Sequence, residues 1–259
     1  MVASAGVAGG GRARVVSGIR LDADGDGQVR RTLLVIGGAE DRVGRSVVLK
    51  RFVKLAGGRR SRVVIVPTAS SFPEEVAQTY QQVFTRLRGG EVDVVHPRTR
   101  RDAVDPDMVE RLDAATGVFL TGGSQTKLAQ NVVGTPVGAA IHRAYDRGAV
   151  IGGTSAGASV LSRFMISLGE EGLTPRQRSS QISAGLDLVP DVIIDQHFDE
   201  RSRYGRLMAM VAASPHLLGL GVDENTAAEI RDGRVLTVIG SGSVFVVNAR
   251  NAITDAPDA

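Results

Sequence analysis

One pentapeptide in the sequence has the composition and the setting of a catalytic serine turn. Residues 153–157 read Gly-Thr-Ser-Ala-Gly, a G-x-S-x-G pattern that directly follows the short apolar run 149–151. A serine on a strained turn between a strand and a helix needs small neighbours, because larger side chains would collide with the surrounding backbone. The pattern predicts a nucleophile elbow with Ser155 as the attacking group. An ordinary N-capping serine in a Gly-rich turn is the alternative interpretation.

A serine nucleophile needs a base, and the chain has four histidines. His197 ends the stretch that begins with the apolar residues 192–194, so it lies at the C-terminal end of an expected strand. Open α/β sheets place their functional sites at that edge. The other three histidines fall within an expected helix or next to prolines, in settings typical of packing or surface residues. We therefore predict that His197 is the general base.

A carboxylate should orient the imidazole of that histidine. Glu224 follows the apolar run 217–222, which is expected to end at the same edge of the sheet. Asp223 is adjacent, and neighbouring side chains on a strand point to opposite faces. The sequence favours Glu224 and leaves Asp223 as its competitor.

Backbone N–H groups that could stabilise a developing oxyanion are expected in two places. Ala156 would begin a helix directly after the serine, so its N–H and the positive end of the helix would face the reacting group. Gly122 and Gly123 follow the strand expected at 118–120 and would let a second donor approach. A tight turn would also explain the two glycines, but it gives no reason for Gln125.

Three arginines come shortly after the candidate base. Arg201, Arg203 and Arg206 lie in a segment expected to be helical, and the last two are three residues apart on one helix face. Guanidinium groups beside a nucleophile are suited to binding carboxylates through two parallel hydrogen bonds. An ordinary solvated basic helix would have the same charge pattern.

The elements that would position these residues alternate along the chain. Apolar, β-branched runs of strand length are expected at 33–36, 63–66, 92–95, 118–120 and 149–151. Segments with helical periodicity separate them, at 45–55, 74–88, 108–115, 126–131 and 138–146. This alternation predicts an α/β fold with a mostly parallel, doubly wound sheet.

The pattern changes after residue 151. We expect a helix from 156, a loop through 178, a strand at 192–194 and a helix from 201. Three late strands are expected near 227–230, 235–239 and 244–248, and they should be antiparallel because Asp-Gly and Ser-Gly turns separate them, at 232–233 and 241–242. We predict a flexible leader at 1–30, one α/β domain at 31–250 and a short tail at 251–259.

Composition narrows the classes of function. The 259 residues include no cysteine, which excludes disulfides, thiolate metal sites and a cysteine nucleophile. The net charge of +3 permits an anionic partner without requiring one. No apolar stretch has the length of a signal peptide core or a membrane span, so we expect a cytoplasmic protein with no membrane partner.

Neither a cofactor nor a metal is predicted. Residues 22–27 match the first half of an EF-hand loop, but the position that needs a bidentate glutamate is Leu33. Residues 37–41 follow an expected strand and are Gly-rich, yet they lack the G-x-G-x-x-G spacing of a dinucleotide loop, and no Walker A sequence occurs.

Six ordered blocks together resemble cyanophycinases. They are Gly-Gly-Ala-Glu-Asp at 37–41, Thr-Gly-Gly-Ser-Gln at 121–125, Gly-Thr-Ser-Ala-Gly-Ala at 153–158, Asp-Gln-His-Phe at 195–198, Arg-x-Arg-x-x-Arg at 201–206 and Gly-Val-Asp-Glu-Asn at 221–225. The resemblance runs from about residue 33 to residue 248. It departs from the family in a longer leader and in a chain that stops at residue 259.

The resemblance implies a fold and an activity. The fold is a class I glutamine amidotransferase-like, or flavodoxin-like, α/β sheet. The activity is serine-type exopeptidase hydrolysis of cyanophycin (multi-L-arginyl-poly-L-aspartate) to β-aspartyl-arginine dipeptides, by a homodimer without metal. Ser155, His197 and Glu224 would be catalytic, and the residues that line the substrate site would be Gln125, Asp195, Gln196, Arg201, Arg203 and Arg206.

Other functions stay open at this point. Related enzymes cleave aspartyl dipeptides or short β-aspartyl peptides, so the resemblance does not fix the substrate's length. A nucleic-acid or anion-binding module would use the Arg-rich segments 59–62 and 98–101, but these lack interleaved aromatic residues, and no nucleic-acid partner is predicted. An α/β-hydrolase esterase would place its acid before the histidine, where only Asp187, Asp191 and Asp195 are candidates.

Overall fold

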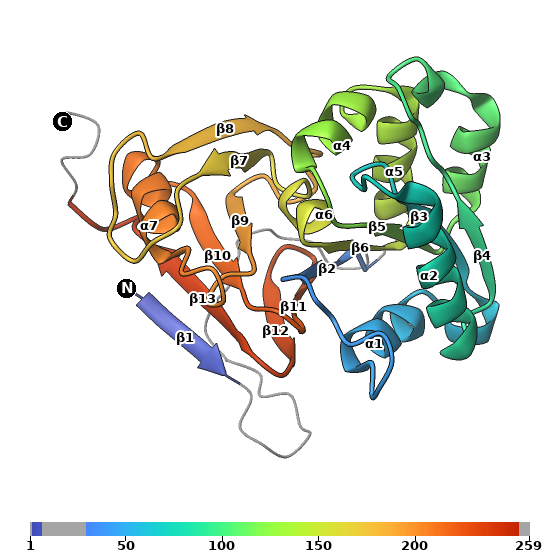
Figure 1. Cartoon of the computed structure of the whole chain (residues 1–259), viewed down its shortest axis with the longest axis horizontal. Helices are drawn as coiled ribbons and strands as arrows, with labels where there is room; N and C mark the ends of the chain where they lie inside the picture. Colours follow the sequence, from blue (N-terminus) through green and yellow to red (C-terminus); the bar gives the residue numbers. More distant parts are fainter. Residues whose placement is uncertain (1, 7–29, 254–259) are drawn as a thin grey trace.

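A seven-stranded sheet forms the centre of the protein, whose computed structural model describes residues 2–6 and 30–253 (Figure 1). The strand order is β12 (Val235–Gly240), β11 (Thr226–Arg231), β2 (Thr32–Ile36), β6 (Val150–Thr154), β5 (Gly117–Leu120), β3 (Arg62–Val66) and β4 (Glu91–Val94). Five neighbouring strands are parallel to one another, namely β2, β6, β5, β3 and β4. The strand β11 is antiparallel to both of its neighbours, β2 and β12. The prediction of a mostly parallel α/β sheet with late antiparallel strands is confirmed.

Helices cover both faces of this sheet because its strands are apolar on both sides. The helices are α1 (Val47–Leu55), α2 (Pro73–Arg86), α3 (Pro106–Ala114), α4 (Gln125–Val132) and α5 (Pro136–Asp146). Along β2, Leu34 packs in one cluster with α1 and α2, and its neighbour Leu33 packs in the other with α3, α4 and α5. Successive strand residues point to opposite faces, so one short apolar run serves both layers.

A second sheet lies beside the first. Its order is β1 (Val2–Gly6), β13 (Ser243–Asn248), β10 (Leu218–Val222) and β9 (Val192–Gln196), and β9 and β10 are parallel to each other. The helix α7 (Tyr204–Ala213) connects β9 to β10 and packs on β10 and β13. Strands near β9, β10 and β13 were expected from the sequence, whereas β1 and the existence of a separate sheet were not.

The late strands were expected to be antiparallel across two turns, which is right for β11 and β12 and wrong for β12 and β13. At Asp232 and Gly233 both φ angles are positive, as a two-residue primed turn requires, and β11 and β12 pair as expected. At Gly240, where φ is 121°, the backbone packs so tightly on Asn225 that an added methyl group would lie 2.2 Å from its carbonyl oxygen. From there the chain passes to the second sheet, where β13 pairs with β1 and β10.

Three further segments differ from expectation. Residues 164–184, expected to be largely loop, contain an antiparallel hairpin of β7 (Phe164–Gly169) and β8 (Ser180–Ala184). Residues 2–6, assigned to the leader, pair with β13 as β1, while 7–29, including the EF-hand-like stretch, lie outside the described residues. The helix after His197 begins only at Tyr204.

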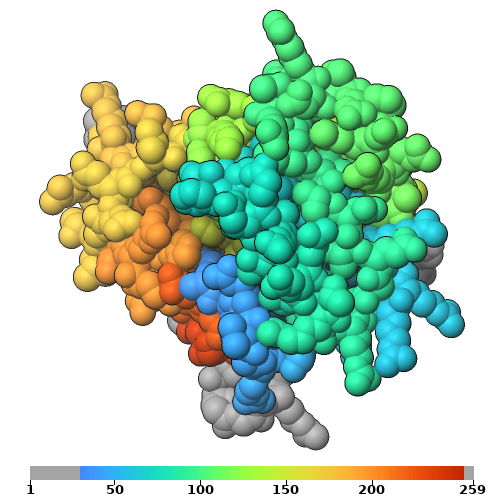
Figure 2. Space-filling view, turned by 45° about the vertical axis from the view of Figure 1, so that its right-hand side comes forward, coloured from blue at the N-terminus to red at the C-terminus, as the bar shows by residue number. Residues whose placement is uncertain are grey.

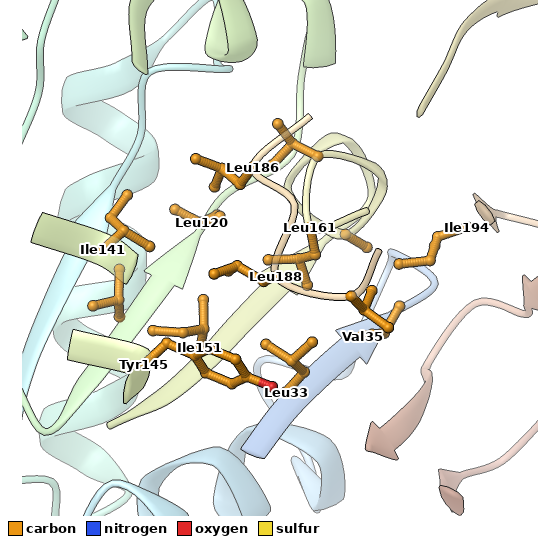
Figure 3. Close-up of a cluster of buried hydrophobic side chains, with 14 of the residues drawn as sticks. Leu33, Val35, Leu120, Ile141, Tyr145, Ile151, Leu161, Leu186, Leu188 and Ile194 are labelled. Atoms are coloured by element: carbon orange, nitrogen blue, oxygen red, sulfur yellow. The ribbon is translucent and has the colours of Figure 1, made fainter. Parts of the chain in front are cut away.

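One apolar core joins the two sheets. Figure 3 shows Leu33 and Val35 of β2, Ile151 of β6 and Ile194 of β9 in a single cluster of buried side chains. Leu186 and Leu188, from the segment between β8 and β9, pack in the same cluster. The edge where both sheets end is therefore held in a fixed arrangement. Within residues 2–6 and 30–253, no helix combines the length and the apolar character that a bilayer crossing requires.

Phe52 on α1 offers a test of the packing on the other face. Its fully buried ring lies 5.4 Å from that of Phe84 and 5.1 Å from that of Phe119, measured between centroids. We expect Phe52→Ala to lower the free energy of unfolding by about 3–5 kcal/mol in urea denaturation, since it leaves a cavity. Phe72→Ala is the matched control, because that ring is 68% exposed, and its effect should stay below about 0.5 kcal/mol. Equal losses would contradict this description of the core.

Candidate active site

Three strand ends from the two sheets meet at one place. Ser155 follows β6 of the central sheet, His197 follows β9, and Glu224 comes two residues after β10. In Figure 2 the surface is hollowed near this junction, between the blue segment after β2, the teal segment after β3 and the orange segment around β9 and α7. The C-terminal edges of parallel strands are the usual location of sites in α/β folds.

The three side chains form a hydrogen-bonded chain. His197 Nε2 lies 2.9 Å from Ser155 Oγ, and His197 Nδ1 lies 2.6 Å from Glu224 Oε1. A carboxylate can only accept, so Nδ1 carries the proton of the neutral ring and Nε2 is left to accept from the serine hydroxyl. The arrangement has the contacts required to remove a proton from Ser155 as it attacks.

Asp223, the competing carboxylate, faces other groups. Its two carboxylate oxygens accept hydrogen bonds from the backbone N–H of Asp199 at 3.2 Å and of Ser243 at 2.7 Å. Burial raises the pKa of this carboxyl group even though these two bonds act in the opposite direction. Of the two candidates, the structure places Glu224 against the imidazole.

The backbone at Ser155 has an unusual conformation. Its φ and ψ are 53° and −115°, between the end of β6 and the short helix α6 (Ala156–Ser159). A non-glycine residue with positive φ is strained and needs support from its surroundings. A methyl group added at Gly153 would lie 2.2 Å from the carbonyl oxygen of Gly157, so the small residues of this turn are required by close backbone approach.

Three successive carbonyl groups, which begin with the last residue of β2, hold the three segments together. The Ile36 carbonyl accepts from the N–H of Ser155 at 3.0 Å, and the Gly37 carbonyl accepts from the N–H of His197 at 2.8 Å. The Gly38 carbonyl accepts from the N–H of Asn225, the residue after Glu224, at 2.8 Å.

The loop needs glycine at positions 37 and 38 because neighbouring atoms leave no space for a side chain. A methyl group at Gly37 would lie 2.0 Å from the Asp223 carbonyl oxygen, and one at Gly38 would lie 2.3 Å from the imidazole of His197. In the sequence this loop was informative only through its family resemblance, since the motif that it suggested by itself was a dinucleotide loop.

Two of the three expected oxyanion donors, Gly122 and Ala156, lie beside the serine. A methyl group at Gly122 would be 3.7 Å from Ser155 Oγ. The N–H groups of Gly122 and Gly123 have no acceptor among the residues that the structure describes. Ala156 is the first residue of α6, so its N–H is one of those that a helix leaves without an internal partner.

Asp195 and two of the arginines form a buried ionic cluster, which differs from the expected row of carboxylate-binding side chains on one helix face. Arg206, on α7, donates from Nε to Asp195 at 2.6 Å and from Nη2 at 2.5 Å, and both side chains are almost fully buried. Arg203 precedes the helix and donates to the Gln196 carbonyl at 2.7 Å and to Glu171 at 3.2 Å. Arg206 is therefore already paired, whereas Arg203 Nε is buried without a partner.

Some of the other side chains that were expected to bind substrate already form hydrogen bonds within the protein. Gln125 donates to the carbonyl groups of Ile166 and Ser167 on β7, at 3.0 and 3.2 Å. Gln196 Oε1 lies 3.3 Å from Ser155 Oγ. Arg201 is half-exposed, and its nearest carboxylate is 3.9 Å away.

One further buried carboxylate, Glu40, was assigned no role from the sequence. Glu40 accepts from Thr154 Oγ1 at 2.5 Å and from the hydroxyl of Tyr80, and its side chain is buried behind the serine turn. Burial, and after it the negative charge of Glu40, raise the pKa of Tyr80 well above its ordinary value. The phenol therefore stays protonated and keeps donating to Glu40, which fixes the residue next to Ser155.

Solved structures share this fold. A peptidase from an acI-B1 Actinobacterium superposes with a TM-score of 0.68, over 87% of this chain and 98% of that one, at 22% identity. A putative peptidase E protein from Listeria monocytogenes aligns with a TM-score of 0.53 and 17% identity, over 80% of this chain and 98% of that one. At such identities the likeness concerns the fold alone.

Closer relatives are found by sequence. A cyanophycinase of Geminocystis herdmanii is 36% identical over 223 residues, which cover 86% of this chain and 82% of that protein. A cyanophycinase of a Nostoc species is 39% identical over 220 residues, 85% of this chain and 74% of that one. The profile of Peptidase family S51 matches residues 33–238, a range that contains all three side chains of the hydrogen-bonded chain. The protein belongs to peptidase family S51.

Proposed function

We propose that this protein is a cyanophycinase, a serine-type exopeptidase that hydrolyses multi-L-arginyl-poly-L-aspartate to β-aspartyl-arginine dipeptides. The relatives at 36–39% identity that carry this name support the proposal. The observation that carries it is the contact of His197 with both Ser155 Oγ, at 2.9 Å, and Glu224 Oε1, at 2.6 Å.

The proposed mechanism follows from these contacts. His197 Nε2 takes the proton of Ser155 as Oγ attacks the scissile carbonyl, and Glu224 stabilises the imidazolium that forms. The N–H groups of Gly122, Gly123 and Ala156 face the oxyanion. His197 then returns the proton to the leaving amine, and water attacks the acyl-enzyme in a second cycle. In this proposal the positive φ of Ser155 is that of a nucleophile elbow in a flavodoxin-like sheet.

Each unit of the polymer has one free carboxylate, on its arginyl branch, and one guanidinium. Arg201 is half-exposed and its nearest carboxylate is 3.9 Å away, so it is proposed to bind the carboxylate, together with its neighbour Arg203 and with Gln125 and Gln196. Asp195 and Arg206 are proposed to support the site by holding the end of β9, because they satisfy each other in a buried bidentate pair. The homodimer and the cytoplasmic location stay predictions.

The test is incubation of the purified protein with cyanophycin, followed by mass analysis of the products. Release of β-aspartyl-arginine dipeptide from the polymer is the expected result. Hydrolysis of short aspartyl or β-aspartyl peptides without attack on the polymer would instead make the protein an aspartyl dipeptidase or a β-aspartyl peptide hydrolase. Turnover of simple esters alone would contradict peptidase activity.

Ser155→Ala should abolish turnover and preserve binding. The substitution removes the attacking oxygen, and the loss of a nucleophile lowers kcat by roughly 10⁴- to 10⁶-fold. Product release by the purified variant, together with calorimetric binding of a short substrate, measures both effects. Turnover near that of the wild type would overturn the assignment.

Glu224→Gln and Asp223→Asn separate the two adjacent carboxylates. We expect Glu224→Gln to lower kcat by about 10²- to 10⁴-fold, since the amide cannot stabilise the imidazolium. The matched change at Asp223 should act mainly on stability, by about 1–3 kcal/mol, because the N–H of Ser243 loses a charged acceptor. The measurements are steady-state kinetics and urea denaturation of both variants. A reversed order of the two kcat losses would assign the orienting role to Asp223.

A further inference from the structure

A groove runs along β11 on the face that α1 covers. It has a volume of about 710 Å³, and its lining includes Asn225, just before β11, and Arg231, at the far end of that strand. Asn225 directly follows Glu224, and its side-chain oxygen accepts from the N–H of Asp41 at 2.9 Å. The groove therefore begins one residue from the candidate active site, and its lining comes from α1, β11 and β12. Figure 1 shows α1 beside these two strands.

The lining carries an excess of positive charge. Its charged side chains are Arg45, Lys50, Arg51, Lys54 and Arg231, with Asp41 and Glu229 as the two carboxylates. Both carboxylates already accept hydrogen bonds from other groups of the protein. Glu229 is fully buried in a bidentate pair with Arg51, at 2.6 and 2.7 Å. Asp41 accepts from three backbone N–H groups, which lower its pKa to about 2.

Three of the cations form no ion pair with the part of the chain that the structure describes. Arg45, Lys50 and Lys54 are exposed, and among the described residues no carboxylate pairs with them. A row of unpaired cations along a groove attracts carboxylate groups and repels guanidinium groups, so a zwitterionic chain would bind there through its carboxylates.

The floor of the groove holds a polar atom that lacks a partner. Thr237 on β12 is only 8% exposed, and its hydroxyl has no hydrogen bond in the structure. It is paired in register with Glu229, so both side chains lie on the sheet face below α1. Buried hydroxyl groups are almost always hydrogen-bonded, and one without a partner in a groove calls for an explanation. The hydroxyl oxygen is covered in the free protein, so a carboxylate entering the groove would accept from it after rotation of the Thr237 side chain.

The spacing of the cations fits a repeating anion. Lys50 and Lys54 are one helical turn apart, a rise of about 6 Å along α1. In an extended polypeptide every second branch leaves on the same side, about 6.6 Å from the last. The carboxylates on alternate branches of an extended poly-aspartate chain would thus match the two lysines.

We propose that the groove between α1 and β12 is a second binding site, which takes the carboxylates of substrate units outside the active site. The inference rests on the proposed function, because it assigns the same polymer to both sites. Its consequence is selectivity for length: the groove contributes to the hydrolysis of long chains and not to that of fragments that fill only the active site.

Kinetics on two substrates test the proposal. For the double variant Lys50→Gln/Lys54→Gln we expect kcat/KM on the polymer to fall about three- to tenfold at low salt, and the loss to shrink as salt rises. On a two-unit fragment the change should stay within about twofold, since no groove contact is made. Arg88→Gln/Arg101→Gln, which removes the same charge outside the groove, should leave both values unchanged. Equal losses on polymer and fragment, or no loss on either, would overturn the proposal; absence of wild-type turnover on both substrates would instead refute the proposed function.

Thr237→Val provides an independent readout. If the hydroxyl binds the ligand, this isosteric change weakens binding of the polymer to inactive Ser155→Ala protein without lowering the melting temperature, because the hydroxyl has no partner in the free protein. Unchanged polymer binding would count against the site.

Calorimetric titration with succinate tests whether the groove binds a small free dicarboxylate instead of the polymer. If Lys50→Gln/Lys54→Gln abolishes succinate binding but leaves hydrolysis of the polymer unaffected, the groove binds a small free dicarboxylate. That result would overturn the proposal for the polymer.

Discussion

The site depends on three consecutive carbonyl groups at the end of one strand. Ile36, Gly37 and Gly38 accept hydrogen bonds from the N–H groups of Ser155, His197 and Asn225, which belong to three segments far apart in the sequence. Each hydrogen bond holds its N–H group about 3 Å from the carbonyl oxygen. Because the three carbonyl groups are consecutive, the three bonds together set the relative positions of the serine, the imidazole and the carboxylate. The two glycines are needed because the other segments come too close for any side chain.

This clamp has its particular form because the site lies between two sheets. Ser155 follows a strand of the central sheet, and His197 and Glu224 follow strands of the second one. The two sheets must therefore be held in a fixed relative position for the three side chains to stay within hydrogen-bonding distance. The shared apolar core in Figure 3 packs the two sheets together, and the buried pair of Asp195 with Arg206 holds the end of β9. A buried ion pair contributes little net stability, but removing either partner is costly, so it favours one arrangement over its alternatives.

Much of this could be predicted from sequence because it depends on local pattern. The small residues around Ser155 indicated its turn, and the apolar runs before Ser155 and His197 placed both at strand ends. Which sheet a strand joins is a tertiary property that periodicity does not encode, so the second sheet went unpredicted. For the same reason the sequence could not separate Glu224 from Asp223. Nor could it show that Arg206 is paired with Asp195, since charge pattern does not distinguish a buried pair from a free cation.

The central claim is that these three segments hold a scissile carbonyl against Ser155 Oγ. The most direct measurement is a crystal structure of the Ser155→Ala protein with a two-unit fragment of the polymer. The account predicts that the scissile carbonyl carbon lies about 3–3.5 Å from where Oγ would be, with its oxygen toward the N–H groups of Gly122, Gly123 and Ala156. A fragment bound with that carbonyl away from residue 155, or on the opposite side of His197, would contradict it.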